Sequence, residues 1–288
     1  MKRASKNKPA YLNPSYPVKR RVKDLISRMT LEEKVAQMLC IWNDKMKTLI
    51  NEKGEFDRAK AKASYPEGYG LGQVARPSDT AGGKNPRQTA ELTNAIQKFF
   101  LEESRLGIPV IFHEECLHGH AAPEATSFPQ PIGLGGTFDP DLVERLYAMT
   151  AYEARVRGAH QALTPVVDVA REPRWGRVEE TFGEDPYLVG CMGAAAVRGF
   201  QGDCTFQDKK HVIATLKHFA AHGQPESGTN CAPVNVSLRV LREIFLYPFQ
   251  KAVAEGAVSV MASYNEIDGV PSHSNRWLLR NVPRKEWG

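Results

Sequence analysis

Long apolar runs are missing from this sequence. Nothing in its 288 residues approaches the roughly 18 consecutive apolar residues that a membrane-spanning helix needs, so no membrane span is expected. The N-terminus carries positive charge but no apolar segment behind it, so it does not read as a signal peptide. We therefore expect a cytoplasmic protein, or a periplasmic or secreted one if the native start has been replaced.

Cysteine is scarce, and acidic residues are scarce at one end. The five cysteines are odd in number and share no metal-binding or redox spacing, which favours reduced, buried thiols. Residues 1–28 hold nine Lys or Arg and one acid, Asp24, a net charge of +8 that leaves −3 for the rest of the chain. Residues 1–28 are thus interpreted as a solvated, partly disordered basic arm, and no nucleic-acid partner is expected.

Phosphate-binding loops are missing too. Gly68 and Gly70 begin a glycine-rich stretch, but the G-x-G-x-x-G pattern would need glycine at position 73, where Gln73 stands. The stretch from Gly133 fails in the same way at Phe138. We therefore expect no dinucleotide cofactor.

What the sequence does contain is an alternation of strand and helix patterns typical of an α/β protein. Helices are predicted from Thr30, whose side chain forms a capping box with Glu33, and over 89–106, 140–158, 186–198, 237–255 and 277–280. Strands are predicted over 68–75, 108–112, 211–216 and 258–262 and in the run Val166–Val169. This spacing demands parallel crossovers. About six β/α units result, so 29–288 is predicted to be an incomplete (β/α)8 TIM-type barrel.

The stretch from Ala162 to Pro186 organises the chain. Its β-branched run predicts a buried strand, and a loop dense with Arg and Glu follows. Asp185 and Pro186 then read as the N-cap and first residue of a helix. In α/β proteins the loops at the carboxyl ends of parallel strands hold the chemistry.

Polar side chains follow the last four predicted strands. The ends of these strands meet at one mouth of a parallel barrel, so their side chains should line a single pocket. Carboxylates, cations, an imidazole and a phenol without a phosphate loop suit a neutral polyhydroxylated ligand. The residues are Glu114 and Glu115, Arg177, Lys217 and His218, and Tyr264 and Asn265.

Each of these residues also has a purely structural interpretation. Arg177 could pair with Glu180 or Glu184 to hold its loop, with or without a ligand role. His218 could be a satisfied core histidine, whereas Lys217 at a buried strand end needs a partner. Met261 could be pocket wall or core, and Tyr264 could be ordinary packing.

The cluster HEECLHGH at 113–120 suggests zinc at first sight. The zinc motif of metalloproteases places two histidines four residues apart on one helix face. Here His113 and His118 are five apart, and Gly119 and Pro123 argue against a helix. No metal site is expected.

Several longer motifs resemble glycoside hydrolase family 3. They are REPRWGRVEETFGEDP at 171–186, KHFA at 217–220, VMASYN at 260–265 and ECLHG at 115–119, and matches run in order from about Leu31 to Gly288. The resemblance implies retaining β-glucosidases, β-xylosidases and related exo-acting enzymes, built on a (β/α)8 barrel followed by a second α/β domain. No metal or organic cofactor is implied.

The resemblance also implies a sugar-binding subsite. Glu115 matches the carboxylate that takes distal ring hydroxyls, which is an Asp in many glucosidase-like members and a Glu in many xylosidase-like ones. Arg177 matches the arginine of the G-R-x-x-E motif, and Lys217 with His218 matches the hydroxyl-binding pair. Met261 and Tyr264 match the subsite wall and the tyrosine near the nucleophile. The Lys-His segment of the family often contains non-prolyl cis peptides.

Two departures from the family pattern concern catalysis. The family nucleophile is an Asp on the seventh strand, expected just beyond Gly288, and the acid/base lies in the second domain. No catalytic residue is therefore assigned in this chain, which is interpreted as a barrel domain truncated before the nucleophile strand and inactive alone. The hexosaminidase branch is disfavoured, because its D-S-H triplet corresponds to ESGTNC at 226–231.

Three functions remain open. The first is the sugar-binding part of a retaining β-glucosidase, the second that of a β-xylosidase, and the third a non-catalytic sugar-binding or interaction fragment. The expected partners are a β-linked oligosaccharide or an aryl glycoside. A complementary C-terminal fragment, or self-association through the open barrel edge, is a further expected partner.

Overall fold

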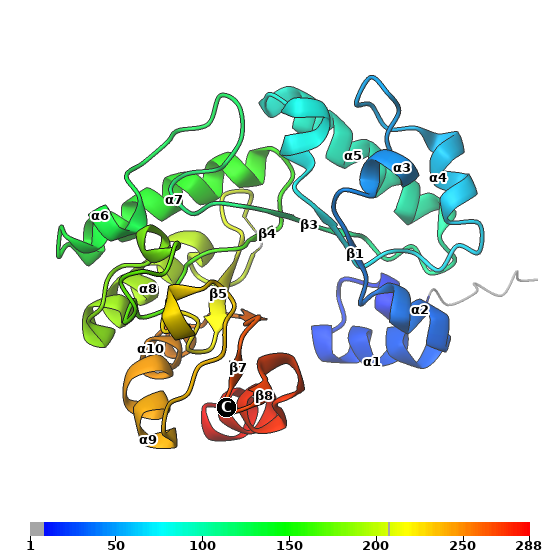
Figure 1. The fold of residues 1–288 in the computed structure, drawn as a ribbon. Coiled ribbons are helices and arrows are strands. Elements are labelled where there is room, and N and C mark those ends of the chain that lie inside the picture. The colour runs from blue at the N-terminus through cyan, green and yellow to red at the C-terminus, as the bar shows by residue number, and fades with distance from the viewer. Residues whose placement is uncertain (1–8, 207) are drawn as a thin grey trace, which may run out of the picture. The chain divides into compact units, whose positions relative to one another are not determined.

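A computed structural model describes residues 9–206 and 208–288. The fold is α/β, an incomplete (β/α)8-type barrel with six parallel strands in sequence order (Figure 1). This confirms the predicted fold class and the predicted number of units. The chain divides into two units, one of Met1–Ala75 with Asn94–Val110 and one of Arg76–Thr93 with Ile111–Gly288.

The first unit contains short helices and two strands. The strands β1 and β2 pair in parallel, with Cys40 opposite Gln73. The predicted capping box is present: Glu33 N donates to Thr30 Oγ1, and Thr30 N donates to the Glu33 carboxylate. The elements are η1 (Ala10–Leu12), α1 (Val18–Arg28), α2 (Leu31–Ala36), β1 (Cys40–Ile41), α3 (Lys45–Thr48), α4 (Arg58–Ser64) and β2 (Gln73–Ala75).

Part of the basic arm is ordered. Residues 1–8 lie outside the described residues, and η1 and α1 occupy most of 10–28. The arm is predicted to be only partly disordered, so these helices do not contradict the prediction. Asp24 explains the order locally, because its carboxylate accepts from Tyr11 N and from the Arg28 guanidinium one helical turn on. The arm is solvated, since α1 buries none of its side chains.

The second unit carries the other four strands and most of the helices. Its strands are β3 (Ile111–Glu114), β4 (Gln161–Ala162), β5 (Ile213–Phe219) and β6 (Ser259–Ala262), and a hairpin pairs β7 (Glu266–Ile267) with β8 (Val270–Pro271). Its larger helices are α7 (Pro140–Val156), α8 (Pro186–Gln201) and α10 (Tyr247–Ala254), and α5 (Pro86–Glu103) begins here. The short elements are η2 (Pro77–Gly82), α6 (Pro131–Gly135), η3 (Val178–Glu180), η4 (Glu226–Gly228), α9 (Leu238–Val240), η5 (Leu241–Phe245), η6 (Ser272–Ser274) and η7 (Trp277–Glu286).

The helices α7, α8 and α10 pack side by side outside the strands of this unit (Figure 1). The predicted N-cap Asp185 is confirmed, because its side chain accepts from the backbone N–H of Leu188, and Asp139 accepts from Leu142 N in the same way. Gly199 lets α7 and α8 approach closely: a Cβ there would lie 2.4 Å from the carbonyl oxygen of Glu144. Tyr147 and Phe200 meet in the resulting contact, with ring centroids 4.8 Å apart.

The organising strand differs from its prediction. The paired residues of β4 are Gln161 and Ala162, upstream of the β-branched run. Thr164–Pro165 follows with a cis peptide bond, and beyond it only Val166 makes an isolated bridge, to Lys217. Pro165 has no N–H to donate to a ladder, so the run is buried and extended without forming a regular strand.

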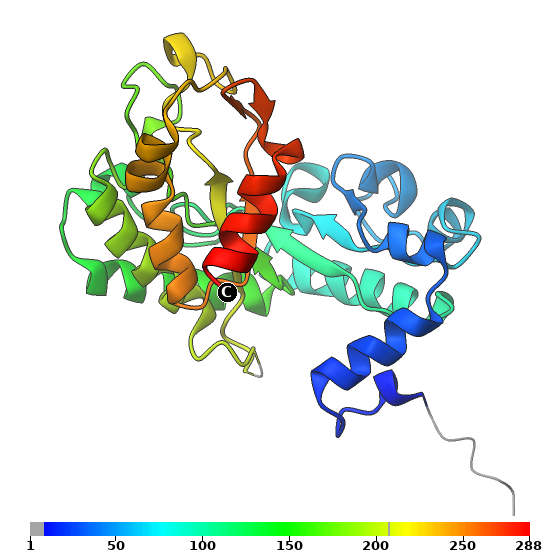
Figure 2. The same cartoon turned by 90° about the horizontal axis from the view of Figure 1, so that it is seen from below.

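The helix predicted over 237–255 is also interrupted. It consists of α9, the π-helical η5 and α10. Pro248 lacks the N–H that would continue the α-helical pattern, and the wider turn lies directly before it. The final helix η7 is longer than predicted and lies close before the C-terminus (Figure 2). Arg242 of η5 donates to Glu286 at the end of η7.

Two further observations concern the cysteines and the membrane. All five cysteines are free, and Cys116 is buried as predicted. The prediction of burial is wrong for Cys40, Cys204 and Cys231, which are exposed, and Cys191 is half-buried. Within 9–206 and 208–288, none of the helices combines the length and apolar character needed to cross a membrane.

Candidate active site

The candidate site lies wholly in the second unit, where the ends of β3 and β5 approach one another. Lys217 is inside β5 rather than after it, and its Nζ donates to Glu115 Oε2 at 3.1 Å. The lysine is almost fully buried, whereas the Glu115 side chain is 31% exposed. The buried ammonium of Lys217 thus has the partner that its burial requires.

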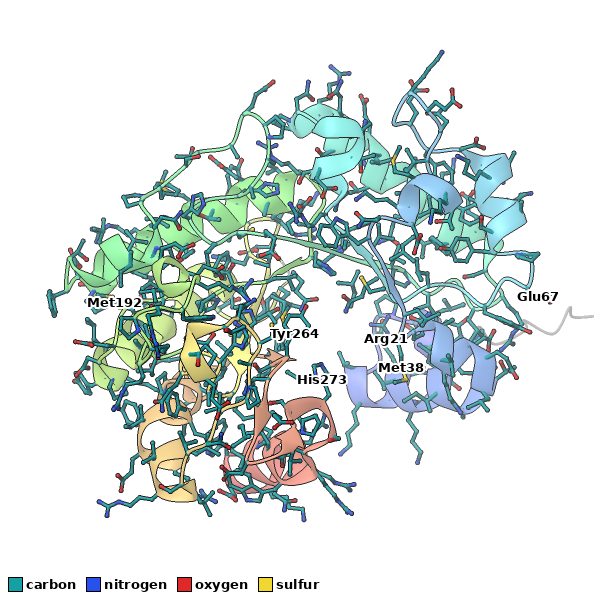
Figure 3. The ribbon with its side chains drawn as sticks, viewed as in Figure 1. Arg21, Met38, Glu67, Met192, Tyr264 and His273 are labelled. Atoms are coloured by element: carbon teal, nitrogen blue, oxygen red, sulfur yellow. The ribbon has the colours of Figure 1, made fainter. Side chains whose placement is uncertain are left out.

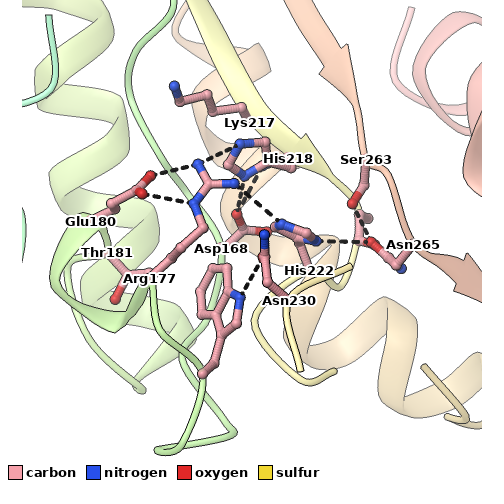
Figure 4. A network of polar contacts seen from close by, with 12 residues as sticks. Asp168, Arg177, Glu180, Thr181, Lys217, His218, His222, Asn230, Ser263 and Asn265 are labelled. Carbon is pink, nitrogen blue, oxygen red and sulfur yellow. Dashed lines mark hydrogen bonds and ion pairs between the residues drawn. The ribbon is translucent and has the colours of Figure 1, made fainter. Parts of the chain in front are cut away.

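Arg177 sits just before η3, and its guanidinium is held on several sides (Figure 4). Nε and Nη2 donate to the two carboxylate oxygens of Glu180, each at 2.7 Å. Nη2 also lies 3.0 Å from Nε2 of His218, and Nη1 lies 3.4 Å from Nε2 of His222. We call Glu180, His218 and His222 the arginine clamp. Arg177 therefore pairs within its loop, as its structural interpretation foresaw, and also contacts the Lys-His segment.

Both clamp histidines are buried, and each has a partner at Nδ1, the ring nitrogen that does not face Arg177. His218 Nδ1 lies 2.8 Å from Asp168 Oδ2, and His222 Nδ1 lies 3.3 Å from Asn265 Oδ1. Burial lowers the pKa of His222, which the neighbouring Arg177 also lowers, so its ring is neutral at pH 7. For Arg177, burial alone would lower the pKa, but the bonds to Glu180 outweigh it and the pKa is raised.

The peptide bonds Lys217–His218 and Phe219–Ala220 are cis, which confirms the expectation for this segment. Three carboxylates surround the site and all three are engaged: Glu115 with Lys217, Glu180 with Arg177, and Asp168 with His218. Each cation or imidazole therefore has its counter-group within the chain.

Tyr264 and Met261 are more exposed than the histidines of the arginine clamp. The Tyr264 side chain is 66% exposed, and its ring is 6.5 Å from that of His222 and 6.4 Å from that of His273 (Figure 3). Met261 is half-buried in β6. The structure thus brings Glu115 into contact with Lys217 and Arg177 into contact with His218, and it places Tyr264 next to His222. That these residues line one sugar-binding cavity stays a prediction.

Glu114, which the sequence grouped with Glu115, faces a different partner. It is buried, and its carboxylate accepts from the backbone N and the hydroxyl of Ser78, at 2.9 and 2.7 Å. His120 Nε2 lies 3.5 Å away from it. Glu114 therefore fixes the loop around Ser78 and is not part of the network that contains Lys217.

Sequence reasoning missed Asp168, Glu180 as part of a clamp, and His222. Asp168 stands between Val167 and Val169 in an apolar run, where a carboxylate needs a buried partner. That signal could have drawn attention to it, but the partner itself is 50 residues away. His222 stands in a polar loop and carries no signal of its own.

Comparisons with known proteins show which family the chain belongs to. The description "Glycosyl hydrolase family 3 N terminal domain" matches residues 30–288. The chain belongs to glycosyl hydrolase family 3. A protein of Formosa agariphila named as a putative β-xylosidase is 36% identical over 280 residues, covering 96% of this chain and 36% of that protein. The periplasmic β-glucosidase of Salmonella typhimurium is 34% identical over 269 residues, covering 93% and 32%.

Solved structures of similar proteins show the same fold. A β-glucosidase from Erythrobacter marinus has a TM-score of 0.86 at 36% identity, covering 98% of this chain and 36% of that one. The β-glucosidase of Listeria innocua in complex with glucose has a TM-score of 0.79 at 35% identity, covering 93% and 36%. A variant of the Listeria enzyme was also solved in complex with laminaribiose. The chain thus spans about a third of the length of the relatives it matches.

Proposed function

We propose that this family 3 chain carries the sugar-binding subsite of a retaining enzyme that removes terminal non-reducing β-D-glycosyl residues, with a β-glucosidase as the first choice. The observation that carries the proposal is that adjacent residues of β5 make the two contacts: Lys217 binds Glu115, and His218 contacts the clamped Arg177. Ring hydroxyls accept from cations and donate to carboxylates. His218, Met261 and Tyr264 complete the proposed subsite. The glucose and laminaribiose complexes of the Listeria enzyme support a β-linked glucoside as ligand.

A β-xylosidase is the alternative. The name of the Formosa relative supports it, and Glu115 is the residue that the resemblance associates with xylosidase-like members. Comparing the affinities of residues 1–288 for methyl β-D-glucoside and methyl β-D-xyloside separates the two. A tighter glucoside complex supports the first choice, and a tighter xyloside complex supports the alternative.

We also propose that residues 1–288 bind a sugar without hydrolysing glycosides. Retaining hydrolysis needs two carboxyl groups about 5–5.5 Å apart, one attacking and one protonating. The three carboxylates around this site are each held by a cation or an imidazole, which leaves none of them placed to attack. This observation also keeps a non-catalytic sugar-binding fragment open as a second function.

Two assays on residues 1–288 test these proposals. Saturation-transfer NMR with the methyl glycosides should show binding, and p-nitrophenyl β-glucoside and β-xyloside should stay uncleaved. Absence of binding to both sugars would reject the subsite. Steady turnover that is lost in an Asp168→Asn or Glu115→Gln variant would reject the binding-only proposal, because it would identify a working carboxylate in this chain.

The location in the cell is a further proposal. We keep the cytoplasm as the first choice, and the name of the periplasmic Salmonella relative supports an exported enzyme as the alternative. Fractionation of the source cells followed by immunodetection distinguishes the two.

A further inference from the structure

Asp168 contacts one residue twice. Its Oδ2 accepts from the backbone N of His218 at 3.0 Å and lies 2.8 Å from Nδ1 of the same residue. Both side chains are nearly inaccessible, with exposed fractions of 0% for Asp168 and 3% for His218. Two bonds from one oxygen to the backbone and the ring of a single residue leave that ring little freedom to turn. Asp168 therefore sets the orientation of the His218 ring.

This pairing also decides which ring nitrogen carries the hydrogen. Nδ1 beside a carboxylate oxygen has to donate, so Nε2 of the neutral ring is an acceptor. Nε2 faces Nη2 of Arg177, a nitrogen that can only donate. A ring with its hydrogen on Nε2 would set one N–H against another. Only the Nδ1–H tautomer bonds to Asp168 and to Arg177 together.

The other side of Arg177 repeats this arrangement. His222 Nδ1 faces an oxygen of Asn265, so Nε2 is left to accept from Nη1 of Arg177. A guanidinium has five N–H donors. Two serve Glu180, one serves each histidine, and one on Nη1 remains. A ligand hydroxyl can take that hydrogen without displacing any contact of the clamp.

We propose that Asp168 is a positioning residue: by holding His218 as the Nδ1–H tautomer, it keeps the Arg177 guanidinium in the orientation that leaves one Nη1 hydrogen for a ligand hydroxyl. The identity of that ligand as a glycoside rests on the proposed function. Asp168 itself is buried behind His218 and does not meet the ligand. Its action is entirely through the histidine and the arginine.

Asp168→Asn tests the proposal with little change in size. The new amide can turn its NH2 group toward Nδ1, which favours hydrogen on Nε2 and opposes the Arg177 N–H. Ring ¹⁵N shifts of His218, measured on ligand-free residues 1–288, report the tautomer. We expect Nδ1–H in the parent and a shift toward Nε2–H in D168N, together with about tenfold weaker binding of methyl β-D-glucoside. Asp139→Asn is the matched control, because this exposed N-cap keeps its capping oxygen and should change neither readout.

The outcomes are separable. A parent protein with hydrogen on Nε2 of His218 overturns the proposal even if D168N does not fold, and so does a folded D168N with unchanged tautomer and affinity. Asp168→Glu retains the acceptor and should retain the Nδ1–H tautomer, so loss of that tautomer would also contradict the proposal. If the tautomers behave as expected but the parent binds no glycoside, the proposed function fails while the positioning role of Asp168 stands.

Discussion

Lys217 and Glu115 join the ends of two strands that are not neighbours. Their Nζ–Oε2 contact of 3.1 Å runs from β5 to the end of β3, and β4 lies between these strands in the sheet order. The Lys217 side chain is buried, whereas the Glu115 side chain is partly exposed to solvent. It uses one of the three ammonium hydrogens, so the pair can present both a donor and an acceptor to a hydroxylated ligand.

Lys217→Ala should weaken glycoside binding without unfolding the second unit. A charge-assisted hydrogen bond to a hydroxyl contributes about 1.5–3 kcal/mol, so the Kd for methyl β-D-glucoside should rise about tenfold or more. Calorimetric titration measures the affinity, and Lys47→Ala is the control, because Lys47 makes only an exposed pair with Asp44. Unchanged affinity would rule out the ligand role, and a large fall in Tm would assign Lys217 to stability instead.

Arg177→Lys should weaken glycoside binding although the substitution keeps the positive charge. An ammonium cannot bond to both oxygens of Glu180 and to the two histidines in fixed directions, so glycoside affinity should drop about tenfold. The same loop offers a control in Arg174→Lys, because Arg174 forms a similar two-bond pair with Glu172 but is 69% exposed. Equal losses in both variants would show that the effect is not specific to the clamp.

The stability of the protein should depend on His160 below neutral pH. Burial lowers the pKa of His160 from 6.5 to about 4, and its Nδ1 accepts from the backbone N of Phe112 at 3.0 Å. Because the folded pKa is the lower one, the unfolded chain binds the proton first as pH falls through 6.5. Stability is therefore complete above pH 6.5 and is lost between 6.5 and 4, by about 2 kcal/mol at pH 5.

Urea unfolding at pH 7.5 and pH 5 measures this loss. His160→Asn retains an acceptor for the Phe112 amide but does not titrate, so it should lose about 2 kcal/mol less than the parent between the two pH values. Carboxylates titrate in both proteins, so their contribution to the pH dependence cancels when the two losses are compared. An identical pH dependence in parent and variant would contradict the assignment to His160.

Gly223→Ala should destabilise the loop behind the site. A Cβ at Gly223 would lie 2.2 Å from the carbonyl oxygen of Val169, and the Gly223 carbonyl accepts from the backbone N–H groups of Arg171 and Glu172. We expect a loss of about 1–3 kcal/mol, from overpacking against backbone that cannot move aside. Gly176→Ala is the matched control, because a Cβ there meets nothing within 4 Å. Thermal unfolding of the two variants checks the prediction, which equal Tm values would refute.

Much of the architecture was predictable because it depends on neighbours in the chain. The N-caps Asp139 and Asp185 each bind a backbone N–H only three residues ahead, and Thr30 forms a capping box with Glu33. A few consecutive residues are therefore enough to predict where these helices begin. The alternation of strands and helices predicted six β/α units for the same reason. The predictions failed where a single proline interrupts the hydrogen-bond pattern of an element. Pro165 does so before the buried run Val166–Val169, and Pro248 does so in the helix predicted over 237–255.

The sequence by itself determined which polar residues lie in or close after the buried strand segments, and only the tertiary structure decided what they bond to. Arg177 could have paired with Glu180 or Glu184, and the fold selects Glu180 while adding His218 from 41 residues away. In the sequence, Asp168 is a single charged residue between Val167 and Val169. Only the fold shows that its partner is the ring of His218 in β5. The reason is physical: a helix cap is a contact within one turn, whereas a buried charge finds its partner only when distant strands pack.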